Sequence, residues 1–428
     1  MTGSLRIAVA DMNGQLRGKR VAPSAAGKAA RAPLSIINVD IFGNDIENSP
    51  LVFESGDQDG ILKPTGRGPV PMPWLGPDAT LDRHCMHTED GSPFASDPHH
   101  ALQAVLDKYA AKGWTIYAAC ELEFYLLRGG ETPAKLTPAT NPKTGRALAM
   151  GEVLSIREID AFDAFFHDIE SGARAMGLGD LSISSEAGVG QFEVTLGHVP
   201  AMTAAENMLL LKELIKGTAQ NHAMTASFMA KPFTDEPGNG LHTHFSVLDG
   251  DGQNIFQTPA LLEHAVAGCL AAMAPSTVIF APFGNSFDRF VENAHAPTTP
   301  TWGYENRTTA LRIPGGPPIA RRIEHRVAGG DANPFLLYAA IFGAAMQGIE
   351  RALTPPAPIT GSAYDVPCDL PPLRPTWDAA ITDITAPVLC DIFGAELLTN
   401  LQRCKRQEYK LLGDMPDHDA KLALLDVV

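Results

Sequence analysis

The sequence has no long apolar run, no paired cysteines and no surplus of positive charge. No stretch reaches the roughly 18 apolar residues of a membrane-spanning helix, and no basic segment followed by an apolar run marks a signal peptide. The six cysteines are scattered without a Cys-x-x-Cys pair, as is typical of reduced thiols in a cytoplasm. The formal net charge of −16 argues against a nucleic-acid or anionic-membrane surface. We therefore predict a cytoplasmic protein.

The glycine-rich signatures of nucleotide binding are missing as well. Gly188-Val189-Gly190 and Gly238-Asn239-Gly240 fit neither the dinucleotide fingerprint nor a P-loop. Any phosphate chemistry must therefore use another device. With 428 residues and 45% apolar composition, the chain is nevertheless long enough for two domains or more.

The order of predicted elements divides the chain near Gly91-Ser92-Pro93. Residues before this point read as short strands separated by turns, whereas helical periodicity begins with Asp97 as an N-cap and Pro98 at the first helical position. Strands between the later helices show no regular βαβ rhythm, so we predict an α+β fold with domains over 1–92 and 93–428. Helices are predicted over 101–112, 158–176, 204–222, 259–274 and 333–353.

The segment Thr115–Leu127 has the alternation of a half-buried strand. Ile116, Leu122 and Phe124 share one apolar face, whereas Glu121 and Glu123 share the other. Two carboxylates side by side on a half-buried surface are costly unless a cation or a basic group neutralises them. Alone, the pair is also compatible with a solvated strand face.

The same alternation recurs twice downstream, each time with ligand-type side chains on one face. In residues 191–196, Glu193 lies opposite the apolar face, and the preceding glycine turn can bring Glu186 beside it. In residues 241–247, one face carries His242, His244 and Ser246. The alternatives are a polar hairpin for the first segment and hydrogen-bonded core histidines for the second.

Several arginines lie between residues 289 and 326, where a further strand segment shows the same alternation. Glu324 shares a strand face with Arg322 and Arg326, and other arginines lie upstream at Arg289, Arg307 and Arg312. Guanidinium groups bind phosphate and carboxylate through two parallel hydrogen bonds. A solvated basic face is the alternative interpretation.

The combined set indicates a particular chemistry. Mg²⁺ and Mn²⁺ prefer carboxylate oxygens, and Mn²⁺ also accepts imidazole. Divalent cations together with arginines are typical of nucleotide-dependent phosphoryl transfer. Zinc is disfavoured at this set because no cysteine belongs to it.

These segments, in this order, resemble the glutamine synthetase family. The resemblance implies a small N-terminal β-grasp domain, followed by a catalytic domain with an open antiparallel β-barrel-like sheet and surrounding helices. It also implies a homo-oligomer, a double-ring dodecamer with active sites at subunit interfaces. The matching stretches are Cys-Glu-Leu-Glu-Phe (120–124), Gly-Gln-Phe-Glu (190–193), Phe-Met-Ala-Lys-Pro (228–232), Gly-Asn-Gly-Leu-His-Thr-His (238–244), Asn-Ser-Phe-Asp-Arg (285–289), Asn-Arg-Thr (306–308), Arg-Ile-Pro (312–314), Arg-Arg-Ile-Glu-His-Arg (321–326) and Asp-Ala-Asn-Pro (331–334).

The resemblance also implies site residues, with two or three Mg²⁺ or Mn²⁺ ions and ATP. The reaction it implies is phosphorylation of the γ-carboxylate of L-glutamate, followed by attack of an amine on γ-glutamyl phosphate. Asp11 of a neighbouring subunit would deprotonate that amine. The first metal would be held by Glu123, Glu186 and Glu193, the second by Glu121, His242 and Glu324; ATP and phosphate by His244, Ser246, Arg307, Arg312 and Arg322; and glutamate by Gly240, Arg289 and Arg326.

Departures from the family pattern bear on the choice of amine. Six residues after Arg289, where glutamine synthetases place a glutamate that attracts ammonium, this chain has His295. We include His295 among the catalytic candidates, together with Asp11 and Arg307. The tyrosine stretch of the ammonium pocket has no match around residues 150–154. The seven-residue spacing from Glu186 to Glu193 resembles γ-glutamylpolyamine synthetases and related γ-glutamylamide ligases instead. We therefore expect an alkylamine or polyamine substrate. The alternatives are glutamine synthesis from ammonium and a catalytically silent structural or binding relative.

Overall fold

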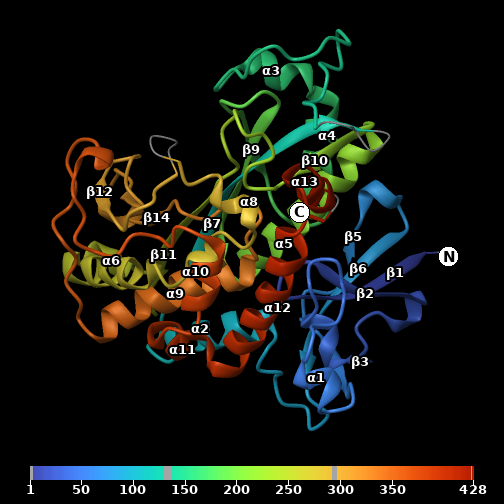
Figure 1. Ribbon diagram of the computed structural model, residues 1–428, viewed down its shortest axis with the longest axis horizontal. Coiled ribbons are helices and arrows are strands. Elements are labelled where there is room, and N and C mark those ends of the chain that lie inside the picture. Colours follow the sequence, from blue (N-terminus) through green and yellow to red (C-terminus); the bar gives the residue numbers. More distant parts are fainter. Residues whose placement is uncertain (1–2, 130–135, 292–295, 426) are drawn as a thin grey trace.

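Two β-sheets and the helices packed on them make up the structure, a computed structural model that describes residues 3–129, 136–291, 296–425 and 427–428 (Figure 1). The N-terminal sheet has the strand order β2-β1-β6-β4-β3, with β5 paired to β6. Strands β1 and β6 are parallel and the other pairs are antiparallel. The bounds are β1 (Ser4–Ala10), β2 (Leu16–Val21), β3 (Ala30–Pro33), β4 (Asp59–Pro64), β5 (Val70–Pro71) and β6 (Ala79–His87).

The second, larger sheet has the order β12-β13-β14-β11-β7-β9-β8, with β10 paired to β7. It is antiparallel, as predicted, except for the parallel pair β12–β13 at one edge. The long strand β7 pairs with β9 and β11 and so forms the middle of the sheet. The bounds are β7 (Thr115–Arg128), β8 (Leu181–Ser185), β9 (Gln191–Pro200), β10 (Met224–Ser227), β11 (Leu241–Leu248), β12 (Trp302–Tyr304), β13 (Leu311–Ile313) and β14 (Ile323–His325).

The apolar face of β7 packs on helices, as its alternation predicts. Leu122 and Phe124 are fully buried in the largest apolar cluster, together with residues of the almost entirely buried α9. The helices are α1 (Pro50–Phe53), α2 (Pro98–Ala110), α3 (Ile156–Ala161), α4 (Asp163–Ala175), α5 (Ala201–Asn221), α6 (Pro259–Met273), α7 (Thr277–Phe280), α8 (Gly284–Phe287), α9 (Pro334–Glu350), α10 (Trp377–Asp383), α11 (Pro387–Phe393), α12 (Ala395–Gly413) and α13 (Asp417–Leu425).

The prediction of one helix over Glu158–Met176 is wrong. The structure has two helices, α3 and α4, that meet at Phe162, whose backbone leaves the helical region with φ −103° and ψ 20°. The ring of Phe162 is buried and lies edge-to-face on Phe192 of β9, with ring centroids 5.2 Å apart. This tertiary contact overrides the continuous helical pattern. In the described parts of the chain, no helix is both long and apolar enough to cross a bilayer.

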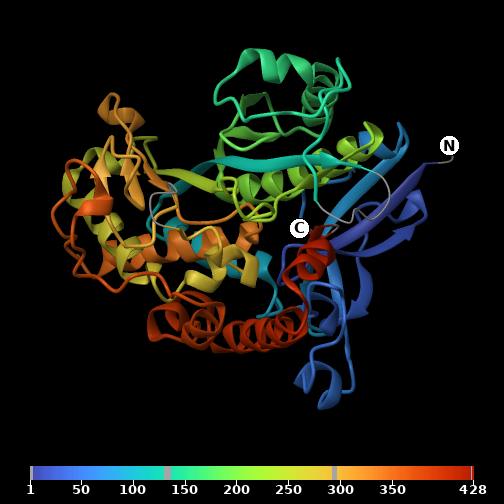
Figure 2. The ribbon, with the colours of Figure 1, turned by 45° about the horizontal axis from the view of Figure 1, so that its top comes forward.

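The N-terminal strands are fastened to α12 by a buried polar network. In Figures 1 and 2 the red helices α12 and α13 lie beside the blue strands. Glu408 of α12 is fully buried and accepts hydrogen bonds from the Asn13 side chain (2.6 Å) and the Ile41 main chain (2.8 Å). Its second oxygen accepts from Lys405 at 2.8 Å. We propose that the chain divides into domains over 1–92 and 93–428, with this network at their junction.

The buried pair Lys405–Glu408 gives a stability prediction. Glu408→Leu leaves the Lys405 ammonium buried without its carboxylate, which should cost about 3–5 kcal/mol of unfolding free energy in urea titration. The control is Lys410→Met on the same helix, which breaks an exposed pair with Glu47 (3.4 Å) and should change stability by less than about 1 kcal/mol. Equal shifts in the two variants would mean that the buried network does not hold the N-terminal strands to α12.

Candidate active site

Strand register brings the predicted acids and histidines to one face of the large sheet. Opposite residues on neighbouring antiparallel strands point to the same face. Glu121 of β7 lies opposite His242 of β11, and Glu123 lies opposite Glu193 of β9. One strand further, His244 lies opposite Glu324 of β14. Three pairs of opposing residues, drawn from segments that are far apart in the sequence, therefore form one cluster across four strands.

Glu186 joins this cluster through the turn between β8 and β9. Its main-chain N–H donates to the Gln191 carbonyl at 2.9 Å, and Gly190 supplies the positive φ of +77° that the tight turn needs. One carboxylate oxygen from each of Glu123, Glu186 and Glu193 lies within 4.8 Å of the other two. Three carboxylates at this separation are a donor set for a hard divalent cation.

A second group of ligand atoms surrounds Glu121. Its two carboxylate oxygens lie 2.9 Å from Nδ1 of His242 and 3.0 Å from Nε2 of His244. Ligand atoms of Glu121, His244 and Glu324 fall within 4.8 Å of one another, as do those of Glu121, Glu193 and His242. The sequence grouped His242 with Glu324, whereas in the structure His244 lies opposite Glu324 and shares a group of ligand atoms with it. The assignment of each ligand to a first or second metal stays a prediction.

The electrostatics of the two groups differ. Burial, reinforced by the neighbouring carboxylates, raises the pKa of Glu193 to about 8 and the pKa of Glu186 to about 7. Burial also acts to raise the pKa of Glu121, but hydrogen bonds from the two histidines outweigh it and hold this pKa below its ordinary value. Glu186 and Glu193 therefore lie in surroundings that favour the protonated acid, whereas the hydrogen bonds to Glu121 favour its carboxylate.

Arginines border the cluster on the β13–β14 side. Arg312 donates to Glu324 at 2.8 Å, Arg326 also pairs with Glu324, and Nε of Arg322 lies 3.3 Å from Nδ1 of His244. Although burial favours the neutral acid, the surrounding positive charges hold the pKa of Glu324 below its ordinary value. The buried Nε atoms of Arg312 and Arg326 have no hydrogen-bond partner, so each retains a donor for an anionic ligand. Arg307 is exposed, and its charge acts to lower the pKa of Glu186 against the larger effect of burial.

The loop before β11 approaches the first group closely. The Gly240 main-chain N–H donates to Oε2 of Glu123 at 2.6 Å. A Cβ at this position would lie 3.0 Å from Nη2 of Arg289 and 3.3 Å from Oε2 of Glu123, so a larger residue would displace these two side chains by a few tenths of an ångström. Arg289 is itself buried and donates to the Val327 carbonyl at 2.6 Å.

Two supporting residues were missed by sequence reasoning. Asn239 is fully buried, and its amide donates to the carbonyls of Ser227 (3.2 Å) and Met229 (2.9 Å). Gln191 donates to the Asn239 side chain and to the Gly238 carbonyl, both at 3.0 Å. Together they fix the glycine loop over Glu123. The position of Gln191 on the same strand face as Glu193 was the available signal.

The other predicted residues lie apart from this cluster or outside the described chain. Ser246 is half-buried on β11, two residues beyond His244. Asp11 is fully buried in its own turn, where it accepts a hydrogen bond from Arg17 at 2.7 Å, and burial raises its pKa to about 6. Its role at a neighbouring subunit stays a prediction. His295 lies outside the described residues.

Residues 95–420 match the family model described as glutamine synthetase, catalytic domain. The chain belongs to the glutamine synthetase family. It is similar to gamma-glutamylputrescine synthetase of Escherichia coli, with 33% identity over 376 residues that cover 84% of this chain and 78% of that protein. It is also similar to glutamate–isopropylamine ligase of a Pseudomonas species, with 32% identity over 385 residues, 86% of this chain and 82% of that protein.

Solved structures confirm the predicted fold class. Structures of GmaS without ligand and in complex with ADP each align with a TM-score of 0.83 at 26% identity, over 99% of this chain and 97% of the other. The fold is therefore the glutamine synthetase fold, with an N-terminal β-sheet region and a curled, barrel-like larger sheet. Members of this family use divalent metals and ATP, which agrees with the carboxylate groups found here.

The raised pKa values of Glu186 and Glu193 predict how metal binding depends on pH. Both carboxyls must lose protons to bind a cation, so Mn²⁺ affinity should rise from about pH 6 to about pH 8.5 in calorimetric titrations. Without a bound cation, the raised pKa values mean that the folded state favours the protonated acids. Their contribution to the free energy of unfolding is therefore fully present below pH 4.5, the ordinary pKa, and is lost as the pH rises through about 7 to 8. Glu193→Gln should make both the Mn²⁺ affinity and the free energy of unfolding depend less on pH. An Mn²⁺ affinity that does not change over this range would contradict the assignment.

Proposed function

We propose that this protein uses ATP to join the γ-carboxylate of L-glutamate to an amine, through γ-glutamyl phosphate. The observation that carries the proposal is the convergence of five carboxylates and two histidines on one sheet face, bordered by arginines with unpaired donors. Two relatives named above support it, gamma-glutamylputrescine synthetase and glutamate–isopropylamine ligase, because each name joins a glutamate or γ-glutamyl group to an amine.

The donor set fits two or three Mg²⁺ or Mn²⁺ ions. We propose that Glu123, Glu186 and Glu193 hold one and that Glu121, His242 and Glu324 hold another. Carboxylate oxygens with at most one imidazole suit these hard cations. When bound, the ions supply charge neutralisation at the phosphate oxygens of ATP.

Binding and orientation of the substrates fall to the arginines and the glycine loop. Arg289 and Arg326 are buried beside the first group and Glu324, where their guanidinium groups suit the α-carboxylate of glutamate. Arg307, Arg312 and Arg322, with His244 and Ser246, suit the ATP phosphates. The unpaired Nε of Arg312 supports this role, because a buried donor without a partner is costly unless a ligand accepts from it.

The second step requires proton removal from the amine, for which we propose Asp11 of a neighbouring subunit. In its own chain the carboxyl is buried, and burial raises its pKa toward neutrality. A carboxyl with a pKa near the working pH is suited to accept a proton from an amine nucleophile. This role requires a homo-oligomer, which we propose to be a double-ring dodecamer in the cytoplasm.

We propose an alkylamine or polyamine as the amine. The glutamate that attracts ammonium in glutamine synthetases is replaced by His295, and a matching tyrosine stretch is absent from the sequence. A site without this glutamate and this tyrosine has less negative charge with which to attract ammonium. Glutamine synthesis is the alternative, and a catalytically silent relative is disfavoured because every metal-ligand position is retained.

An amine panel tests the proposal. Purified protein with ATP, L-glutamate and Mg²⁺ or Mn²⁺ is offered putrescine, ethanolamine, isopropylamine, methylamine and ammonium, and ADP release is measured with identification of the product by mass spectrometry. We expect at least one amine to give its γ-glutamylamide faster than ammonium gives glutamine. The best rate with ammonium would establish glutamine synthesis instead, and no ADP above background would leave only a silent relative.

Glu324→Ala tests the metal assignment. Loss of this buried carboxylate removes a cation ligand and the partner of two arginines, so ADP release should fall by at least about 100-fold. The control is Glu350→Ala, which removes an exposed carboxylate 3.9 Å from Lys112 and should leave the rate within about twofold. Full activity of Glu324→Ala, in protein that remains folded by circular dichroism, would remove Glu324 from the site.

His295→Glu tests the choice of amine. A glutamate at this position restores the negative charge that attracts ammonium, so the ratio of kcat/KM for ammonium to kcat/KM for the best amine should rise by about tenfold. The matched control is His167→Glu on the exposed face of α4, which should leave the ratio unchanged. The same ratio in wild type and His295→Glu would show that position 295 does not select the amine.

A further inference from the structure

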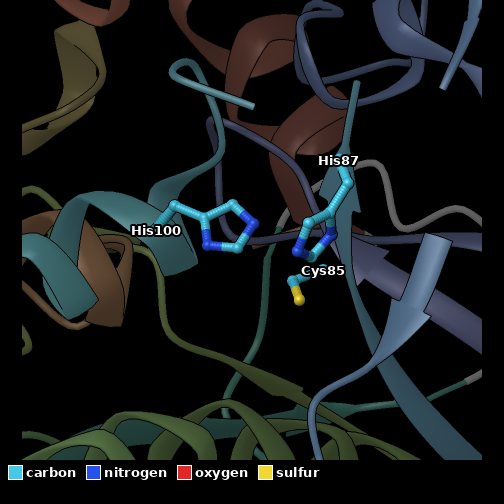
Figure 3. Close-up of side chains that lie close together, drawn as sticks. All are labelled: Cys85, His87 and His100. Atoms are coloured by element: carbon cyan, nitrogen blue, oxygen red, sulfur yellow. The ribbon is translucent and has the colours of Figure 1, made fainter. Parts of the chain in front are cut away.

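A second cluster of ligand-type side chains lies away from the carboxylate cluster, where β6 meets α2. Figure 3 shows Cys85 and His87 from the end of β6 close to His100 from the first turn of α2, with the two histidine rings facing each other. One ligand atom from each of the three side chains lies within 4.8 Å of the other two. The proposed ligase reaction uses none of these three residues.

The backbone around the cluster is firmly fixed. Cys85 and His87 are two residues apart on one strand and therefore share a face. Asp97 caps α2 by accepting from the His99 main chain at 2.8 Å, and its other oxygen accepts from the Met86 main chain at 2.6 Å. This buried carboxylate ties the start of the helix to the end of the strand. The approach of His100 to the strand is therefore built into the fold.

The histidine tautomers are suited to metal binding. Nε2 of His100 lies 2.8 Å from the Met86 carbonyl, which can only accept, so this nitrogen carries the proton and Nδ1 keeps its lone pair. A ligating histidine usually donates its other N–H to a carbonyl in this way. Nδ1 of His87 is buried and no group completes a hydrogen bond of normal geometry to it. The two rings meet edge-to-face with centroids 4.8 Å apart.

We propose that Cys85, His87 and His100 bind a borderline divalent cation such as Zn²⁺, with water as a fourth ligand. A thiolate with two imidazoles favours Zn²⁺ over Mg²⁺ or Ca²⁺, which prefer oxygen. Zn–S and Zn–N distances of about 2.3 and 2.0 Å place ligand atoms on the order of 3.5 Å apart in a tetrahedron. The ligand atoms of the present cluster lie at most 4.8 Å apart, so closure requires at most about 1.3 Å, which is within the reach of side-chain rotation.

Two positive charges act on Cys85 and oppose the cation, those of Arg83 and Lys63. Lys63 on the adjacent strand β4 lies opposite Cys85, and its ammonium donates to the Gly91 carbonyl at 3.0 Å. A metal-bound thiolate would offset part of this positive charge, so Cys85 is the ligand on which the site depends. A bound ion would link strand to helix across residues 88–99 and so restrict the joint between the N-terminal strands and the helical region.

Cobalt absorption tests the proposal on the full-length, reduced protein. Co²⁺ bound to a thiolate gives a near-ultraviolet charge-transfer band, and the described residues of the carboxylate cluster include no cysteine, so ions bound there give none. We expect wild type to show the band and stoichiometric Zn²⁺ to remove it. Cys85→Ser should abolish it, whereas the control Cys390→Ser, which removes a half-buried thiol far along the chain, should keep it.

Variants of the two histidines provide an independent test if circular dichroism shows that Cys85→Ser does not fold. His87→Gln and His100→Gln keep the thiol and should each weaken Co²⁺ binding at the band by at least about tenfold. Ligase activity in these variants is expected to persist, so loss of the band and loss of turnover are separate results. No thiolate band in wild type, or a band of unchanged affinity in both histidine variants, would overturn the site.

Discussion

Repulsion among carboxylates on one face of a sheet is the constraint on which the site depends. Glu123, Glu186 and Glu193 are held together by strand register and a tight turn, and burial with mutual repulsion raises the pKa of Glu193 to about 8. A fold retains such an arrangement when a cation offsets the charge. The histidines on Glu121 and the arginines on Glu324 solve the same problem with internal partners. We propose that a metal ion solves it for Glu123, Glu186 and Glu193.

The fold supports this face from behind. The opposite face of β7 is apolar and packs on the buried helices, so the strand cannot rotate to expose its acids without losing its core contacts. Gln191 and Asn239 hold the glycine loop over Glu123, and the buried Glu408 network holds the N-terminal turn that carries Asp11 against the C-terminal helices. Positions far apart along the chain therefore act as one scaffold for the charges.

Alternation of apolar and ligand-type residues made the strands and the site predictable from sequence. Each ligand face could be read locally because strand side chains alternate, and the matching order of segments supplied the family. Tertiary effects could not be read in this way. The helix break at Phe162 depends on its contact with Phe192, and the pairing of His244 rather than His242 with Glu324 depends on strand register. The approach of His100 to Cys85 and His87 likewise depends on a helix cap, so the spacing of the cysteines alone gave no sign of it.

Anomalous diffraction from crystals soaked in Mn²⁺ with a non-hydrolysable ATP analogue tests the central claim most directly. The account predicts two Mn²⁺ ions. Glu123, Glu186 and Glu193 coordinate one of them, and Glu121, a histidine and Glu324 coordinate the other. Crystals with no Mn²⁺ in contact with these carboxylates would contradict it.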